Sequence, residues 1–98
     1  MMTNNQLLLR QKRQQILQTA ARYGVKRLRV FGSVARGEDT ERSDIDFLIA
    51  LDSGRSLLDL IGLKNDLEDY LHRPTDVVTE GCLHHLIRQR VLDEAKPL

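Results

Sequence analysis

The sequence of 98 residues predicts one α/β (α+β) domain, residues 1–98, with a small mixed three-stranded sheet and flanking helices. Three short, mostly apolar runs bounded by turn residues have the length of strands: 25–31, 45–51 and 75–79. Stretches in which apolar residues recur at helical spacing precede, separate and follow these runs. The predicted order is therefore α-β-(turn)-β-α-β-α, and no repeat or linker divides the chain.

The first helix is predicted over residues 5–22. Thr3, Asn4 and Asn5 are candidates for its N-cap, and Gly24 stands where a glycine commonly ends a helix. The apolar residues at roughly helical spacing in this stretch are Leu9, Ile16, Leu17, Ala20 and Ala21.

The connections between the predicted strands set their directions. Strands 25–31 and 45–51 are joined too briefly for a crossover helix, so we expect them to pair antiparallel. Strand 75–79 follows a predicted helix and is expected to run parallel to strand 45–51. The nearly continuous apolar residues from Phe47 onward are typical of a strand covered on both faces.

Two more helices are predicted after the second strand. The first begins after Ser56, which with Asp59 resembles a capping box, and ends at about His72. The second runs from Leu83 to about Ala95. The residues expected to be buried are Leu57, Leu60, Ile61, Leu67 and Leu71 in the first helix, and Leu86, Ile87, Val91 and Leu92 in the second.

Composition excludes several classes of function. With 15 basic and 14 acidic residues, the net charge gives no reason to expect direct nucleic-acid binding or membrane affinity. Four aromatic residues are too few for a base-stacking platform. The single cysteine, Cys82, excludes an internal disulfide, and Leu7–Leu9 is too short for a signal or membrane segment, so we expect a cytoplasmic protein.

The candidate functional residues lie just before and at the start of the second predicted strand. The first strand ends in Gly32-Ser33, ten residues follow, and Asp44-x-Asp46 opens the second strand. Because strand side chains alternate, Asp44 and Asp46 point to the same side, where their oxygens suit Mg²⁺. A Gly-Ser turn before a helix offers N–H groups and a hydroxyl to phosphates. The stretch therefore predicts a nucleotide-handling site.

A third acid, Asp76, opens the third predicted strand. Asp76 should lie beside Asp46 if the parallel strands enter the sheet at the same end. Two-metal phosphoryl-type transfer needs ions roughly 3.5–4 Å apart, held by several carboxylates. Asp76 would complete such a centre of two Mg²⁺ ions and could accept a proton from an attacking hydroxyl.

Each of these residues also has a purely structural interpretation. Asp44 could cap a turn, Asp46 could be a solvent-side strand residue, and an acid after a proline is ordinary turn chemistry for Asp76. Ser33 could be only an N-cap. Arg36 either reaches the phosphates or is an exposed loop cation.

Two other groups of side chains are interpreted as surface residues. Cys82, His84 and His85 lack the four well-spaced ligands of a structural zinc site. The basic side chains of Arg10, Lys12 and Arg13 fit a solvated helix face better than an RNA-binding patch.

Two segments, Phe31–Gly37 and Ser43–Ile49, resemble the minimal nucleotidyltransferases of the DNA polymerase beta-like superfamily. These are the MntA-type antitoxins that are paired with HEPN ribonuclease toxins. The resemblance covers essentially the whole chain in length and element order. Phe47 stands where this family often has leucine, a change of volume that should not affect the chemistry.

The resemblance implies a role for each matching residue. Gly32 and Ser33 would hold the triphosphate, Asp44 and Asp46 would bind Mg²⁺, and Asp76 would complete the metal site and assist deprotonation. It further implies that ATP is the donor and that AMP is transferred to a tyrosine hydroxyl of the cognate HEPN toxin, which silences the toxin.

The small size of the chain supports an acceptor on another molecule. The predicted elements supply a nucleotide pocket but leave little chain for a second pocket, so a partner surface or a second copy must hold the acceptor. Homo- or hetero-oligomers are compatible with this. Two alternatives stay open: an antitoxin that acts by complex formation alone, and nucleotidyl transfer to a small molecule or RNA end.

Overall fold

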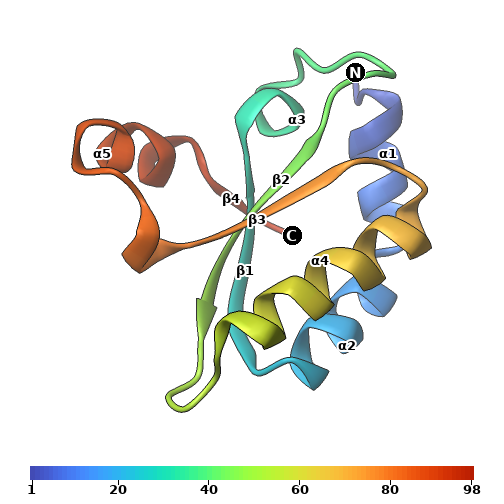
Figure 1. The fold of residues 1–98 in the computed structure, drawn as a ribbon. Helices are drawn as coiled ribbons and strands as arrows, with labels where there is room; N and C mark the ends of the chain where they lie inside the picture. The colour runs from blue at the N-terminus through green and yellow to red at the C-terminus, as the bar shows by residue number, and fades with distance from the viewer.

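The computed structural model describes residues 1–98 and arranges them as a four-stranded mixed sheet with helices on both faces (Figure 1). The strand order is β3-β2-β1-β4. β1 (Val25–Phe31) pairs antiparallel with β2 (Ile45–Leu51), and β3 (Thr75–Thr79) pairs parallel with β2. The three predicted strands, their bounds and their directions are confirmed.

The sheet has a fourth strand, so the prediction of three strands is corrected. β4 (Lys96–Pro97) pairs antiparallel with Arg29 and Val30 of β1. Two residues, one of them proline, show no alternating pattern, and only their contact with β1 makes them a strand.

Three helices cover one face of the sheet: α1 (Asn4–Gln11), α2 (Arg13–Arg22) and α4 (Leu57–Leu71). The hydrophobic core lies between these helices and the sheet. None of the helices in the protein is long and apolar enough to cross a membrane. The side chains with no exposed surface in this cluster are Ile16, Ile45, Phe47, Ile49, Leu63 and Leu67.

The predicted helix 5–22 is divided at Lys12, whose φ of −102° and ψ of 12° depart from helical values. The N–H and C=O of Lys12 still make helical hydrogen bonds, so the division is a bend. Leu9 and Ile16, seven residues apart and so on one side of the helical stretch, are both buried in the core. Thr3 is the N-cap, in a capping box.

Helix α4 begins with the predicted capping box of Ser56 and Asp59. The predicted burial of Leu57 and Ile61 is wrong, because these side chains are 68% and 46% exposed. Ile61 precedes the buried Leu63 by two residues, a rotation of about 200° around the helix. The side chain of Ile61 therefore points away from the sheet. The buried stripe of α4 consists of Leu63, Leu67 and Leu71.

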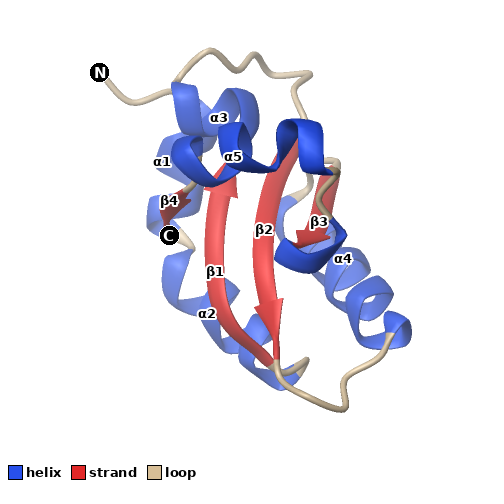
Figure 2. Cartoon of the chain, turned by 90° about the vertical axis from the view of Figure 1, so that its left-hand side faces the viewer, coloured by secondary structure: helices blue, strands red, loops and turns tan.

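The other face of the sheet is covered only in part. A short 3₁₀ turn, η1 (Glu80–Cys82), leads to α5 (His85–Glu94), which begins later than predicted because His84 Nδ1 caps it by accepting from the Leu86 N–H. Figure 2 shows α5 crossing the upper ends of β1 and β2. Val91 is buried, but Leu86 and Ile87 are 78% and 49% exposed, contrary to prediction, because the outer side of α5 faces solvent.

Candidate active site

Two of the predicted acids lie side by side on neighbouring strands. Asp46 of β2 is the direct register partner of Asp76 of β3. Because side chains alternate along a strand and Phe47 is buried in the core, both acids point to the face that α5 partly covers. Asp44, just before β2, is exposed, as is Asp76, whereas Asp46 is half-buried. The backbone thus brings the three carboxylates to one end of the sheet.

Gly32 lies directly beside Asp46. Phe31, the last residue of β1, pairs with Asp46, and Gly32 then begins α3 (Gly32–Arg36). Gly32 has a φ of 75°, and a Cβ at this position would collide with Asp46 Oδ2. Only glycine accommodates both this backbone conformation and the neighbouring carboxylate.

Helix α3 also carries Ser33 and Arg36. Ser33 lies in the first turn, where backbone N–H groups have no partner within the helix. Arg36 Nη1 donates to Glu94 Oε1 at 2.7 Å, and Arg36 Nε donates to Glu38 Oε2 at 3.0 Å. Arg36 is therefore paired with two acids at the border of the site, and the pair with Glu94 ties α3 to α5.

Glu94, in the last turn of α5, is a site residue that the sequence did not reveal. Its Oε2 accepts from the Gly32 N–H at 2.7 Å, across 62 residues of chain. No motif or periodicity distinguishes Glu94 from the other acids on a polar helix. Only the position of α5 over the sheet brings it to Gly32.

Carboxylates outnumber cations at this end of the sheet. The pKa of Asp46 is raised from 3.8 to about 6, first by burial and then by neighbouring negative charges. These charges belong to Asp76, Asp44 and Glu94, and Arg36 opposes them. Burial alone would also raise the pKa of Glu94, but hydrogen bonds from Arg36 and a backbone N–H outweigh it, so the pKa of Glu94 is lowered.

The donor set suits a magnesium ion by its chemistry. Carboxylate oxygens are the hard ligands that Mg²⁺ prefers, and a cation would relieve the repulsion felt by Asp46. The side chains themselves are not gathered around one point, since no three His, Cys, Asp or Glu residues form a group that could hold a metal. The fit of Asp44, Asp46 and Asp76 to Mg²⁺ rests on their shared face and their repulsion.

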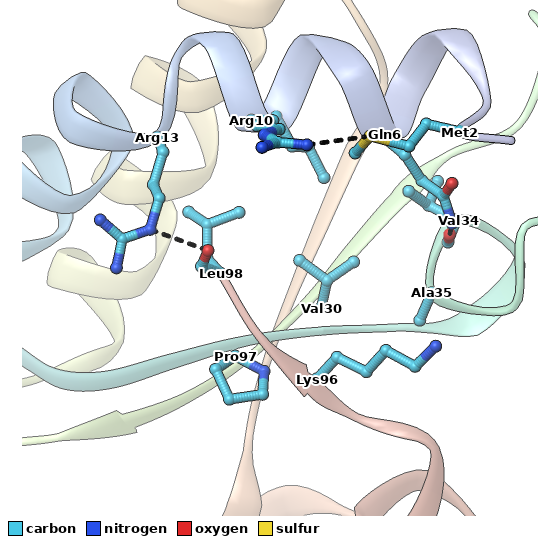
Figure 3. Close-up of a pocket in the computed structure, with 11 residues that line it drawn as sticks. Met2, Gln6, Arg10, Arg13, Val30, Val34, Ala35, Lys96, Pro97 and Leu98 are labelled. Atoms are coloured by element: carbon cyan, nitrogen blue, oxygen red, sulfur yellow. Dashed lines mark hydrogen bonds between the residues drawn. The ribbon is translucent and has the colours of Figure 1, made fainter.

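A pocket of about 440 Å³ lies elsewhere, between α1, α3 and the edge formed by β1 and β4 (Figure 3). Its floor is apolar and includes Val30 and Val34, and its rim carries Arg10, Arg13 and Lys96. None of the six predicted site residues lines it. The predicted site lies instead at one end of β2 and β3, where Asp44 and Asp76 are exposed and Asp46 is half-buried.

Comparisons with known proteins identify the family of the chain. The family model described as "Nucleotidyltransferase domain" matches residues 11–98. The chain is 45% identical over 83 residues to the "Putative protein adenylyltransferase" of Methanocaldococcus jannaschii, covering 85% of this chain and 89% of the relative. It is 41% identical over 73 residues to "Protein adenylyltransferase MntA" of Thermococcus cleftensis, covering 74% of each.

Solved structures share the fold. One described as "Structure of putative minimal nucleotidyltransferase" has a TM-score of 0.86 and 48% identity, with 95% of each chain covered. Another, described as "Crystal structure of the toxin-antitoxin with AMP-PNP", has a TM-score of 0.74 and 20% identity, covering 86% of this chain and 69% of the other. At that identity the second likeness shows the fold alone.

Proposed function

The chain belongs to the nucleotidyltransferase domain family and is a nucleotidyltransferase, and from that premise we propose that it is an antitoxin that adenylylates its toxin. With Mg²⁺, it transfers AMP from ATP to a tyrosine hydroxyl of a HEPN ribonuclease toxin in the cytoplasm. The observation that carries the proposal is the in-register pair of Asp46 and Asp76 beside Gly32. This arrangement supplies acids for a metal and a proton next to donors for phosphate.

The three acids have different roles in the proposed transfer of AMP. Asp44, Asp46 and Asp76 would hold Mg²⁺, which when bound neutralises triphosphate charge and orients the α-phosphate. Asp76, exposed on β3, accepts the proton of the tyrosine hydroxyl. The hydroxyl oxygen then forms a bond to the α-phosphorus, the bond between that phosphorus and the bridging oxygen breaks, and pyrophosphate leaves.

Donors at α3 hold the phosphate oxygens. The Gly32 and Ser33 N–H groups lie in its first turn, and the Arg36 guanidinium lies at its other end. Catalysis of this kind consists mainly of positioning and charge stabilisation, so the donors must be fixed before the reaction. The positive φ of Gly32 fixes this turn against Asp46.

The position of the site favours a protein acceptor. Asp44 and Asp76 are exposed, so an acceptor on another molecule can approach them directly. Named relatives are described as protein adenylyltransferases, and a structural neighbour is described as a toxin–antitoxin. The first description supports a protein acceptor, and the second supports a toxin as that protein.

The test is incubation with ATP, Mg²⁺ and the candidate toxin, followed by intact-mass measurement. We expect the toxin to gain the mass of one or more AMP units. The double variant Asp44→Asn, Asp46→Asn should transfer none, while Asp52→Asn, an acid at the opposite end of β2, should transfer normally. Full labelling by the double variant would refute the proposed site.

The same measurement separates the two alternatives. An unmodified toxin in a tight complex would show an antitoxin that acts by binding alone. AMP found on RNA ends or on a small molecule, with the toxin unmodified, would show a different acceptor.

A further inference from the structure

Both oxygens of the Glu94 carboxylate are bound to donors that the proposed function assigns to the nucleotide. Oε2 accepts from the Gly32 N–H at 2.7 Å and Oε1 accepts from Arg36 Nη1 at 2.7 Å. The Glu94 side chain is only 15% exposed, so it lies within the site and not at its rim. Glu94 thus joins the two ends of α3.

A phosphate group and a carboxylate satisfy these donors in the same way. Each presents negatively charged acceptor oxygens to a backbone N–H and a guanidinium. The Gly32 N–H has one hydrogen, which Glu94 Oε2 accepts, and Arg36 Nη1 donates to Glu94 Oε1. A triphosphate that accepts from the Gly32 N–H must therefore displace Glu94 from it, and Glu94 competes for Arg36 as well.

Few contacts hold the end of α5 that carries Glu94, so its side chain can be displaced. Val91 is the one buried residue of α5, and β4, which follows Glu94, pairs with β1 at two residues only. The negative charge of Glu94 also contributes to the repulsion at Asp46. The carboxylate is held mainly by the two hydrogen bonds that it makes itself.

We propose that Glu94 is an internal competitor for the phosphate-binding donors. It occupies the Gly32 N–H and Arg36 while no nucleotide is bound, leaves when the triphosphate of ATP binds, and returns as pyrophosphate departs. The inference rests on the proposed function, because it takes Gly32 and Arg36 to be the phosphate donors. Glu94 therefore lowers the affinity for ATP and hastens the release of pyrophosphate.

The direct test is the affinity of Glu94→Gln for AMP-PNP in the presence of Mg²⁺, measured by calorimetry. The amide keeps the shape but loses the charge that competes with phosphate, so we expect binding about tenfold tighter than in the unsubstituted protein. Asp93→Asn is the matched control, since it removes the same charge one residue earlier, where the side chain is exposed and bonds only Gln89. Its affinity should not change.

A second readout is the inhibition of transfer by pyrophosphate, which should become stronger in Glu94→Gln by a similar factor. If the glutamine variant does not fold, Glu94→Asp replaces it in the test. Its shorter side chain cannot span both donors, so this variant should also bind AMP-PNP more tightly than the unsubstituted protein. A structural role alone would not strengthen binding of either anion.

The outcomes separate this inference from the proposed function. If the unsubstituted protein binds AMP-PNP and transfers AMP, but Glu94→Gln binds no more tightly, Glu94 is not a competitor. Weaker binding by Glu94→Gln would show that Glu94 helps to hold the nucleotide or its metal. Failure of both proteins to bind AMP-PNP would overturn the inference and the proposed function together.

Discussion

At the scale of single residues, the site depends on the contact between Gly32 and Asp46. The sequence motif predicted both residues, and the structure shows why they belong together: the space left by the missing side chain at position 32 holds Asp46 Oδ2. Substitution at either position therefore affects the other. The backbone of Gly32 adds a second requirement, since its φ of 75° strains any other residue.

Replacing Gly32 with alanine should damage both the fold and the reaction. The positive φ alone costs about 1–3 kcal/mol, and the collision with Asp46 adds to it. Gly54→Ala is the matched control, because Gly54 has a φ of 85° with nothing within 4 Å of an added Cβ. Urea unfolding should show a larger loss for Gly32→Ala, and only this variant should lose transfer. Equal losses with transfer retained would contradict the contact.

The raised pKa of Asp46 makes a prediction about stability and pH. Because its folded pKa is about 6 and its ordinary value is 3.8, the folded state binds more protons between these values. The contribution of Asp46 to stability therefore falls as pH rises from about 4 to 6 and stays low above that range.

The variant Asp46→Asn removes this effect. In EDTA at pH 7.5 it should be more stable than the unsubstituted protein, by on the order of 1 kcal/mol once solvent screening is considered. At pH 4.5 the advantage should be smaller, because Asp46 is then largely protonated. Urea unfolding at the two pH values measures the difference, and a constant advantage would rule out titration of Asp46 as its cause.

Local motifs predicted the residues at positions 32, 33, 44 and 46, because each motif places its residues a few positions apart, whereas Asp76 was predicted from the expected parallel pairing of its strand with β2. Their catalytic and binding roles stay predictions until transfer is measured. Arg36 was left between two interpretations, and the structure adds its pairing with Glu94 and Glu38. Glu94 could not be predicted, because its partners are 58 and 62 residues away and it matches no pattern.

At the scale of elements, the start of β3 is held by α4. Glu68 Oε2 accepts from the Thr75 N–H at 3.1 Å, and Lys64 Nζ donates to Glu68 Oε1 at 3.0 Å. These hydrogen bonds lower the pKa of Glu68. Because Thr75 directly precedes Asp76, the contact between α4 and β3 also positions a predicted catalytic acid.

Removing this link should loosen the first residues of β3. Glu68→Ala leaves the N–H of the buried Thr75 without its acceptor, so we expect a lower midpoint of urea unfolding and faster hydrogen exchange at the Thr75 amide. Transfer should also fall, because Asp76 is displaced. Asp69→Ala, one residue later on the exposed side of α4, should change none of these. Unchanged exchange in Glu68→Ala would show that the link does not hold β3.

The strands and the capping box of α4 followed from the sequence because both leave local patterns. The bend at Lys12, the two-residue β4 and the exposure of Ile61 and Leu86 did not. β4 depends on its pairing with β1, and the other features depend on how the helices lie on the sheet, so residues far apart in the chain decide all of them. Local apolar spacing identifies a helix better than it identifies the buried face.

At the scale of the whole molecule, the site lies at one end of the sheet and opens away from the helical layer. Both tyrosines of the chain are on the opposite side, packed against the core cluster between the helices and the sheet. The Tyr23 hydroxyl donates to Asp66, and Lys12 Nζ lies 4.3 Å from the centre of the Tyr70 ring. Neither tyrosine hydroxyl can therefore reach the three acids of the site, Asp44, Asp46 and Asp76, in its own molecule.

The isolated protein should therefore not label itself. Incubation with ATP and Mg²⁺ but without a toxin should leave its intact mass unchanged, because both tyrosine side chains pack against the core on the opposite side of the sheet. Mass spectrometry of the digested protein checks this at Tyr23 and Tyr70. AMP on either tyrosine would show that another copy can serve as acceptor, or that the helical layer opens.

The in-register pairing of Asp46 with Asp76 also ties the chemistry to the folding of the chain. Strand side chains alternate, so a slip of one residue between β2 and β3 would turn Asp76 toward the core and place Val77 in the site. The buried Thr75 and the hydrogen bond from the Ile45 N–H to the Pro74 carbonyl at 2.9 Å set this alignment. Molecules with the wrong alignment would have no activity at all. The specific activity of a preparation should therefore report the fraction of its molecules that have folded correctly.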